Sequence, residues 1–240
     1  MNKNLKLFLG ASYIILLLVF LYFIFSYVEI TRLNEFLYYK QLQVYLEEAI
    51  SSNLYFNLLI FFLFSVLWVA LLGFGSPLLI ISGILFGKWI GTFISVLSIS
   101  IGALILYSIA SYFFKELVSS IIKKKFSKYI DVFKKNEFIY FLSFRIVGGF
   151  GIPFGLQNIL PVVFNLKKSN YFFASFFGFF PMFYIWNTIG AGLNDYIKQA
   201  DDFNFMNLIL KQEIYLPAIL FIIIMFISVV IKKRIFDAPN

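Results

Sequence analysis

The chain has 240 residues, of which 61% are hydrophobic and 13% are charged, and its mean hydropathy is +0.89. A soluble fold of this length could not bury so much apolar surface, so the composition excludes a soluble globular protein and indicates an integral membrane protein. The chain contains neither cysteine nor histidine, which excludes disulfides, Cys/His metal sites and catalytic pairs built on either residue. We therefore expect no cofactor and no enzymatic activity.

Three segments precede the first irregular region. Residues 7–28 are uncharged and predict an uncleaved transmembrane helix. Residues 29–48 mix charged residues with tyrosines, which is typical either of an interfacial amphipathic helix or of a plain connector. Residues 49–87 carry no charge at all, yet one helix needs only about 20 residues to span the hydrocarbon core. This run therefore holds one span, residues 54–72, and a further apolar piece.

The further piece lies in the stretch LLGFGSPLLIISGILFGKWIG, residues 71–91. Glycine and proline weaken helices, so Gly73, Gly75 and Pro77 are expected to break the helix once, and Gly83 and Gly87 a second time. Non-helical backbone survives at membrane depth only inside protein or beside a water-filled cavity. The pattern predicts a re-entrant hairpin over about residues 73–88. The alternative is a pair of kinked helices packed through their small residues.

The second half follows the same plan. An uncharged span (89–114) leads to a basic loop (115–137) with seven lysines against three acidic residues, a net charge of +4, which predicts a cytoplasmic location. Residues 138–166 are apolar but irregular and predict a second re-entrant hairpin before another span, 169–194. The residues expected to form this hairpin are Gly148, Gly149, Gly151, Pro153, Gly155 and Pro161.

The expected fold is an all-α integral membrane protein. It contains an inverted repeat of two re-entrant hairpin-plus-helix units with extra flanking transmembrane helices. We divide the chain into an N-terminal helix and interfacial segment (1–53), a membrane core (54–195) and a C-terminal region (196–240). The C-terminal region consists of a loop, a last span (214–231) and a basic tail. The basic residues 232–234 place the C-terminus in the cytoplasm, whereas the side of the N-terminus stays open. The oligomeric state is open too, and a homo-oligomer is compatible with the pattern.

Two motifs resemble a known family. GSPLLIISGILFGKWIGTFISVLSISIGALILYSIA resembles the first signature of the VTT-domain, SNARE-associated branch of the DedA superfamily, and FRIVGGFGIPFGLQN followed by GFFPMFYIWNTIGAG resembles the second. The resemblance covers roughly residues 55–195. It implies two facing re-entrant hairpins around a membrane-embedded cavity in a bacterial cell membrane, and movement of phospholipid or polyprenyl-phosphate carriers between leaflets. The residues that match the family's motifs are Arg145, Pro153, Phe154, Asn158, Gly83, Phe86 and Gly87.

The chain also departs from the family. Bacterial members thought to be proton-coupled carry acidic residues in the first hairpin and a second arginine, whereas this chain has Gly151 and Gly155 around the second tip and no acidic residue in any apolar run. A buried carboxylate is the usual proton relay of a membrane pump. We therefore expect lipid to move passively.

Arg145 is the strongest candidate for substrate binding, because an intramembrane arginine is costly and needs a partner. Its guanidinium either binds an anionic phosphate head group or satisfies carbonyls of the broken helices. Gln157 and Asn158 have the same two alternatives, and Asn187 and Thr188 are expected to form interhelical hydrogen bonds. The expected partners are membrane lipids rather than nucleic acid, since the net charge of +8 suits anionic lipids and cytoplasmic loops. The alternative function is a non-transporting membrane scaffold or assembly factor.

Overall fold

The computed structural model describes residues 35–72, 74–113 and 136–235, and isolated positions 8, 11, 12, 14–16, 18, 19, 22, 26, 115, 116 and 120. The regular structure of these residues is entirely helical, which confirms the all-α prediction. The predicted first span (7–28), most of the basic loop (115–137) and Gly73 lie outside the described residues.

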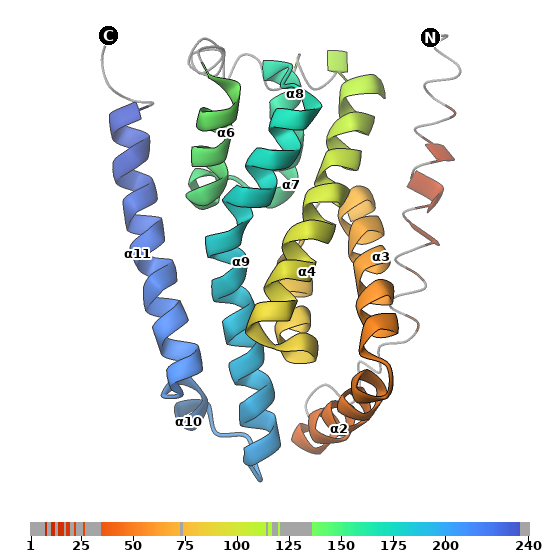
Figure 1. The fold of residues 1–240 in the computed structure, drawn as a ribbon, viewed down its shortest axis with the longest axis vertical. Coiled ribbons are helices and arrows are strands. Elements are labelled where there is room, and N and C mark those ends of the chain that lie inside the picture. The colour runs from red at the N-terminus through yellow and green to blue at the C-terminus, as the bar shows by residue number, and fades with distance from the viewer. Residues whose placement is uncertain are drawn as a thin grey trace.

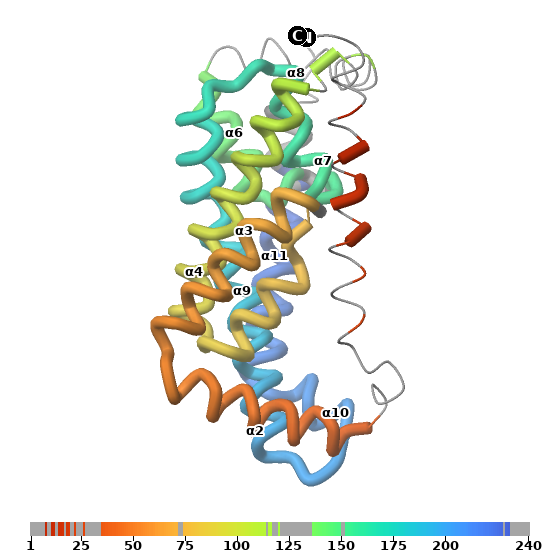
Figure 2. The backbone as a smooth tube through the Cα atoms, turned by 90° about the vertical axis from the view of Figure 1, so that its right-hand side faces the viewer, coloured from red at the N-terminus to blue at the C-terminus, as the bar shows by residue number. Residues whose placement is uncertain are grey.

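The described helices form a bundle in which α4 and α9 pack against each other at the centre, with α3, α6 and α11 around them (Figure 1). Figure 2 shows α2 lying across the lower end of the bundle instead of along it. The bounds are α2 Phe36–Ser52, α3 Leu54–Leu72, α4 Ser76–Phe113, α6 Glu137–Ile146, η2 Gly148–Gly151, α7 Phe154–Ile159, α8 Pro161–Phe164, α9 Lys168–Gln199, α10 Phe205–Ile209 and α11 Gln212–Ile235.

Helix α4 is two antiparallel arms, not one rod. Gly87 has φ 72° and ψ 177°, a backbone conformation that in practice only glycine adopts. The hydroxyls of Ser82 and Ser95 lie 2.7 Å apart, although 13 residues of straight helix would separate them by about 20 Å. In Figure 1, α4 descends to its reversal and then climbs to the upper end of the bundle. We call residues 76–86 arm α4a and residues 88–113 arm α4b.

Arm α4a brings the chain back to the end at which α3 begins. Ile84 and Leu85, near the end of α4a, line the same pocket as Leu54, the first residue of α3. The apolar stretch Leu54–Leu71 is long and apolar enough to span a membrane, in agreement with the span predicted for residues 54–72.

Several residues expected to interrupt helices lie inside them. Gly83 has helical geometry within α4a, Gly155 lies within α7, and Pro161 is the first residue of α8. Pro77 is the second residue of α4, where its missing N–H has no intrahelical partner to lose. Glycine breaks a helix only where packing does not hold it, and Gly83 is held by close contact with α9.

The second half reverses in a similar way. Helix α6 runs inward from the upper end, and the chain turns at Gly148 and Gly149, whose φ angles are 66° and 69°. Helices α7 and α8 then return to the upper end. Asn165, with φ 55° and ψ 43°, ends α8 in the left-handed conformation that asparagine tolerates. After it, α9 runs the full length of the bundle.

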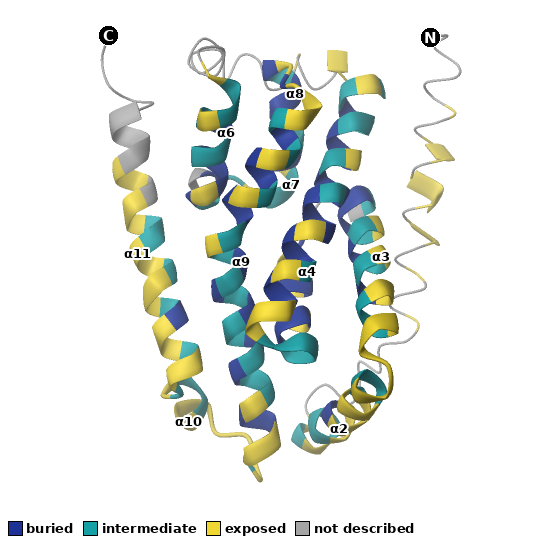
Figure 3. Ribbon diagram, in the orientation of Figure 1, coloured by how far each residue is buried: buried dark blue, intermediate teal, exposed yellow. Residues whose placement is uncertain are grey.

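Many of the exposed residues on the outside of the bundle, which are yellow in Figure 3, are large hydrophobic side chains. Phe226 and Ile222 of α11 are 72% and 66% exposed, and Phe177 of α9 is 54% exposed. Water does not tolerate so large an apolar surface, whereas lipid does. The helices long and apolar enough to span a membrane are Leu54–Leu71, Ser76–Phe113 and Lys168–Gln199, while Gln212–Ile227, within the predicted last span, is a shorter apolar helix.

Candidate functional site

The candidate site lies at the turn between α6 and α7, halfway along the bundle. Arg145, in the last turn of α6, is 1% exposed and is the largest fully buried side chain among the described residues. Nη2 of Arg145 donates to Oδ1 of Asn158 (2.8 Å) and to the hydroxyl of Tyr171 (2.9 Å). Its Nε donates to Oγ of Ser175 (3.2 Å), and its Nη1 donates to Oε1 of Gln157 over a longer 3.4 Å.

Aromatic rings enclose the same guanidinium. Its central carbon lies 4.6 Å from the ring centre of Phe179, 4.7 Å from Phe141, 5.4 Å from Tyr171 and 5.8 Å from Phe154. Ring faces attract a desolvated cation, by about 2 kcal/mol in favourable cases. This attraction offsets part of the cost of burying Arg145, but a ring carries no net charge. No carboxylate of the described residues pairs with Arg145, so the site keeps a net positive charge.

Gln157 holds the turn in place. Its Nε2 donates to the carbonyl oxygens of Ile152 (2.6 Å) and Gly148 (3.1 Å), which lie on the two sides of the turn. A Cβ on Gly149 would overlap the Gln157 amide, so this position needs glycine for its space as well as for its positive φ. The NH2 group of Gln157 therefore forms hydrogen bonds with backbone carbonyls, which is one of the two alternatives that the sequence left open.

Asn158 is fully buried and accepts a hydrogen bond directly from Arg145. Besides accepting from Arg145, its Oδ1 lies 3.3 Å from the hydroxyl of Tyr171. The two amides that the sequence singled out thus have different surroundings, although they are adjacent. Gln157 binds the turn through its Nε2 and reaches the cation only through the 3.4 Å contact of its Oε1, whereas Asn158 accepts from the cation at 2.8 Å.

Helix α9 supplies contacts that the sequence did not single out. Tyr171, Ser175 and Phe179 follow one another at four-residue spacing and therefore lie on one face of α9, the face turned to Arg145. Gly178, on the same face, leaves room for the arginine stem, because a Cβ there would overlap Cβ of Arg145. The four-residue spacing could have identified this face of α9 from the sequence, but it does not show which helix packs against the face.

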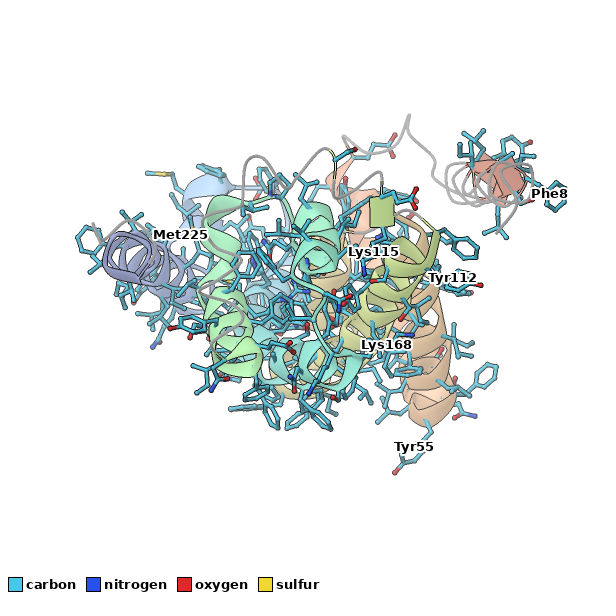
Figure 4. The ribbon with its side chains drawn as sticks, turned by 90° about the horizontal axis from the view of Figure 1, so that it is seen from above. Phe8, Tyr55, Tyr112, Lys115, Lys168 and Met225 are labelled. Carbon is cyan, nitrogen blue, oxygen red and sulfur yellow. The ribbon has the colours of Figure 1, made fainter. Side chains whose placement is uncertain are left out.

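A pocket of about 280 Å³ opens beside Arg145. It lies where the turn before α4 meets the turn before α7: a Cβ on Gly75 would come within 3.8 Å of the Phe154 ring. Helix α11 closes the remaining side, and Figure 4, seen from above, shows this helix, marked by Met225, at the edge of the bundle. The lining residues are Gly75, Ser76, Leu79, Arg145, Gly148, Ile152, Phe154, Gln157, Phe179, Met182, Phe183, Trp186, Phe221 and Met225.

Only some of the residues singled out from the sequence line this pocket. Arg145, Gln157, Phe154, Gly75 and Gly148 line it. The others lie elsewhere: the lining does not include Asn158, Pro153, Pro77, Gly83, Gly87, Gly149, Gly151, Gly155 or Pro161.

A second polar cluster joins α4 to α9 below this pocket. Oγ of Ser82 lies 2.5 Å from Oδ1 of Asn187 and 2.7 Å from Oγ of Ser95, so it links both arms of α4 to α9. This confirms the expected interhelical hydrogen bond of Asn187. Thr188 instead donates to the carbonyl oxygen of Tyr184 within α9, so the same expectation is wrong for Thr188.

Glycines allow this close approach. A Cβ on Gly83 would overlap the backbone of Asn187, one on Gly91 would overlap the Asn187 side chain, and one on Gly190 would overlap the carbonyl of Ile80. The alternative of packing through small residues therefore applies to Gly83 and Gly91. We call this contact the glycine seam.

Within the described residues, no group of three or more acidic, histidine or cysteine side chains could hold a metal ion. The polar side-chain groups that line the pocket are one guanidinium, one amide, one hydroxyl and one indole N–H. Such a set can bind and orient an anion, but it offers neither a metal site nor a pair of carboxylates for acid–base chemistry.

A family model for the VTT domain matches residues 69–192, just over half of the chain. The chain belongs to the VTT-domain family. The match begins near the end of α3 and ends in α9, so it contains both reversals, Arg145, its partners on α9 and the glycine seam. This confirms the resemblance read from the two sequence motifs and makes the chain a membrane protein of the DedA type. Comparisons with curated proteins and with solved structures gave no match.

Proposed function

We propose that this VTT-domain protein moves phosphate-bearing lipids between the two leaflets of a membrane, and that Arg145 binds the phosphate in transit. The observation that carries the proposal is a buried arginine that has no carboxylate partner among the described residues and lines a pocket at the meeting point of two interrupted helices. A buried cation is costly unless its charge is compensated. A lipid phosphate supplies that compensation.

The hydrogen bonds of Arg145 leave a place for an anion. Nε and Nη2 have partners at 2.8–3.2 Å, but Nη1 has only the 3.4 Å contact with Gln157, which also lines the pocket. A phosphate oxygen would form a shorter, charge-assisted bond with Nη1. The apolar walls suit the glycerol and acyl region of a lipid, because apolar lining with a few placed polar groups is typical of ligand pockets.

The architecture supports a translocation path. In this proposal, α3 with α4a and α6 with α7–α8 are two re-entrant hairpins that enter from opposite faces of the membrane and meet at the pocket. Arms α4b and α9 are then the corresponding full spans of an inverted repeat. Gly87 and Asn165, both with positive φ, mark the same place in each unit, between the returning arm and the long helix.

The orientation follows from the basic residues. The end of α4, the start of α6 and the end of α11 lie at the upper end of Figure 1, and Lys115 and Lys168 lie at this end in Figure 4. We place this end in the cytoplasm of a bacterial cell, since cytoplasmic segments are rich in lysine and arginine.

We infer that movement is passive. The residues that line the pocket include no aspartate or glutamate. A proton-coupled carrier needs a titratable group that changes charge along the path. The lipid's own gradient is then the driving force, and no pH gradient is required.

A scaffold without transport is the alternative, and one observation favours it. The hydrogen bonds of Arg145 tie α6 to α7 and α9, so the arginine would stabilise the fold even if no lipid ever reached it. A scaffold needs these bonds but no path for lipid, so a transport assay separates the two functions.

The test is lipid scrambling by the purified protein in liposomes that contain a fluorescent phospholipid, with dithionite added outside. The proposal expects dithionite to bleach inner-leaflet probe in protein-containing vesicles beyond the half lost from empty ones. Arg145→Ala should slow this loss, whereas Lys168→Ala, which removes an exposed cation that does not line the pocket, should not. If the protein is folded but scrambles no lipid, the proposal is wrong for phospholipids. The same assay with a labelled polyprenyl phosphate would then distinguish a carrier of that lipid from a scaffold.

A further inference from the structure

A second pocket, of about 390 Å³, lies at the lower end of the bundle between α2, the start of α3, the end of α4a and the end of α9. It is separate from the Arg145 pocket: the two have no lining residue in common, and the glycine seam lies between them on α4a and α9. Both of its charged residues, Glu47 and Lys198, lie outside the region that matches the VTT domain.

The lining of this pocket has two kinds of side chain. Leucines and isoleucines of α2, α3 and α4a form an apolar wall, which includes Leu54 and Leu85. The polar side chains come from α2 and α9 and are Gln43, Glu47, Ser51, Asn194 and Lys198. A polar rim next to an apolar wall matches a lipid, whose head group and acyl chains need these two environments side by side.

The charges of the rim are balanced. Nζ of Lys198 lies 2.8 Å from Oε1 of Glu47, and Nε2 of the buried Gln43 donates to Oε2 of the same carboxylate at 2.8 Å. The ion pair is accessible, because the side chains of Lys198 and Glu47 are 36% and 56% exposed. A pair this exposed contributes little by itself, so a ligand can separate its partners at small cost.

We propose that this pocket binds the head group of a zwitterionic phospholipid, with Lys198 on the phosphate and Glu47 on the ammonium group. Such a ligand replaces one ion pair with two and leaves no charge unpaired. An anionic head group would satisfy Lys198 but would leave its negative charge beside Glu47, which disfavours binding. The pocket therefore differs from the Arg145 pocket, where the only charge is positive.

The site requires only that the protein lie in a membrane, so it does not depend on translocation. Because the chain has no cysteine, Ser51→Cys introduces a single thiol at the pocket for an environment-sensitive fluorophore. The full-length labelled protein in detergent micelles is titrated with phosphatidylethanolamine and, separately, with phosphatidylglycerol of the same acyl chains. A signal at Ser51 reports this pocket and not the one beside Arg145.

The expected result is a tighter response to phosphatidylethanolamine, by about two- to fivefold, the range that one partly exposed charge pair supplies. Glu47→Gln should remove this preference, and Lys198→Gln should weaken the response to both lipids. Glu48→Gln is the matched control, because it removes the same charge from the next residue of α2, which does not line the pocket. It should behave as the unsubstituted protein.

Two results would overturn the proposal: equal responses to both lipids in the parent protein, or equal effects of Glu47→Gln and Glu48→Gln. The double variant Glu47→Lys with Lys198→Glu tests whether the pair is only structural. It restores an ion pair between α2 and α9 but exchanges the positions of the charges, so it should fold and yet bind phosphatidylethanolamine less well. Full binding by this variant would count against the proposal.

Discussion

Arg145 and Asn158 lie 13 residues apart on opposite sides of a chain reversal, yet Nη2 of one is 2.8 Å from Oδ1 of the other. The bond joins the last turn of α6 to α7 across the turn at Gly148 and Gly149. It supplies a neutral acceptor to a buried cation, which leaves the positive charge available to a ligand. This combination of a fixed geometry and an uncompensated charge underlies the first prediction.

Asn158→Asp should slow lipid movement without unfolding the protein. The carboxylate takes the place of the amide oxygen and pairs directly with Arg145, so it competes with a lipid phosphate for the same charge. We expect scrambling to fall by about tenfold, which corresponds to about 1.4 kcal/mol, while the thermal midpoint stays equal or rises.

Asn158→Leu is the comparison for that variant. It removes the acceptor without adding a charge and should lower stability by about 1–3 kcal/mol, the cost of leaving a buried donor unpaired. If Asn158→Asp scrambled lipid at the parent rate, Arg145 would have no contact with the phosphate in transit.

Ser82→Cys combined with Ser95→Cys should form a disulfide on oxidation. The hydroxyls they replace lie 2.7 Å apart, whereas an unbroken helix would hold these positions about 20 Å apart. Closing so short a loop should stabilise the protein by about 3 kcal/mol. Thiol titration and thermal unfolding with and without reductant measure both effects.

The same disulfide should leave scrambling unchanged if the arms of α4 move as one body. Ser82→Cys with Ser100→Cys is the control, because residue 100 lies more than one turn further along α4b and on another face. Free thiols in the first double variant after oxidation would show that the chain does not reverse at Gly87.

Glycine replacements should separate backbone strain from lack of space. At Gly87 nothing lies near a new Cβ, so Gly87→Ala should cost only the strain of its backbone conformation, about 1–3 kcal/mol. Gly87→Asn should be no better, because ψ 177° lies outside the left-handed helical region that asparagine tolerates.

Gly149→Ala should be worse than either variant of Gly87. Its φ of 69° is strained for alanine, and its Cβ would also displace the amide of Gln157 from the turn carbonyls. Thermal unfolding of the three purified variants gives the ranking. A Gly149→Ala protein as stable as Gly87→Ala would mean that Gln157 can move away at no cost.

Acid should loosen the contact between α2 and α9. Hydrogen bonds from Lys198 and then Gln43 lower the pKa of Glu47 below its usual 4.5. A carboxyl group whose pKa is lower in the folded state stabilises the fold above its unfolded pKa, and this contribution disappears as the pH falls through the folded pKa. As the pH falls from 7 to 3, the protection factors of the α2 amides, which correct exchange rates for the intrinsic effect of pH, should therefore decrease.

Glu47→Gln should remove this pH dependence, and Glu48→Gln should retain it. Glu48 is the suitable control because it lies next to Glu47 on α2 but does not line the pocket with Lys198. A dependence that persists in full in Glu47→Gln would show that Glu47 is not its source.

Local sequence patterns were sufficient for the class of protein and for the positions of its irregular segments. The length and hydropathy of the uncharged runs required helices in a membrane, because lipid leaves backbone groups no partner but one another. Gly148, Gly149 and Gly87 lie at reversals, as their freedom at positive φ allows. The cost of an unpaired arginine in an apolar run was enough to single out Arg145.

Tertiary structure alone decided what these residues contact. Gly83 and Gly87 are both glycines in the same apolar run, yet Gly83 packs on α9 and Gly87 reverses the chain. Likewise, Gln157 and Asn158 are adjacent amides, yet the NH2 group of Gln157 donates to carbonyls of the turn, whereas the amide oxygen of Asn158 accepts from Arg145 at 2.8 Å. A residue's conformational range is a local property, whereas its partners depend on which distant helix lies beside it.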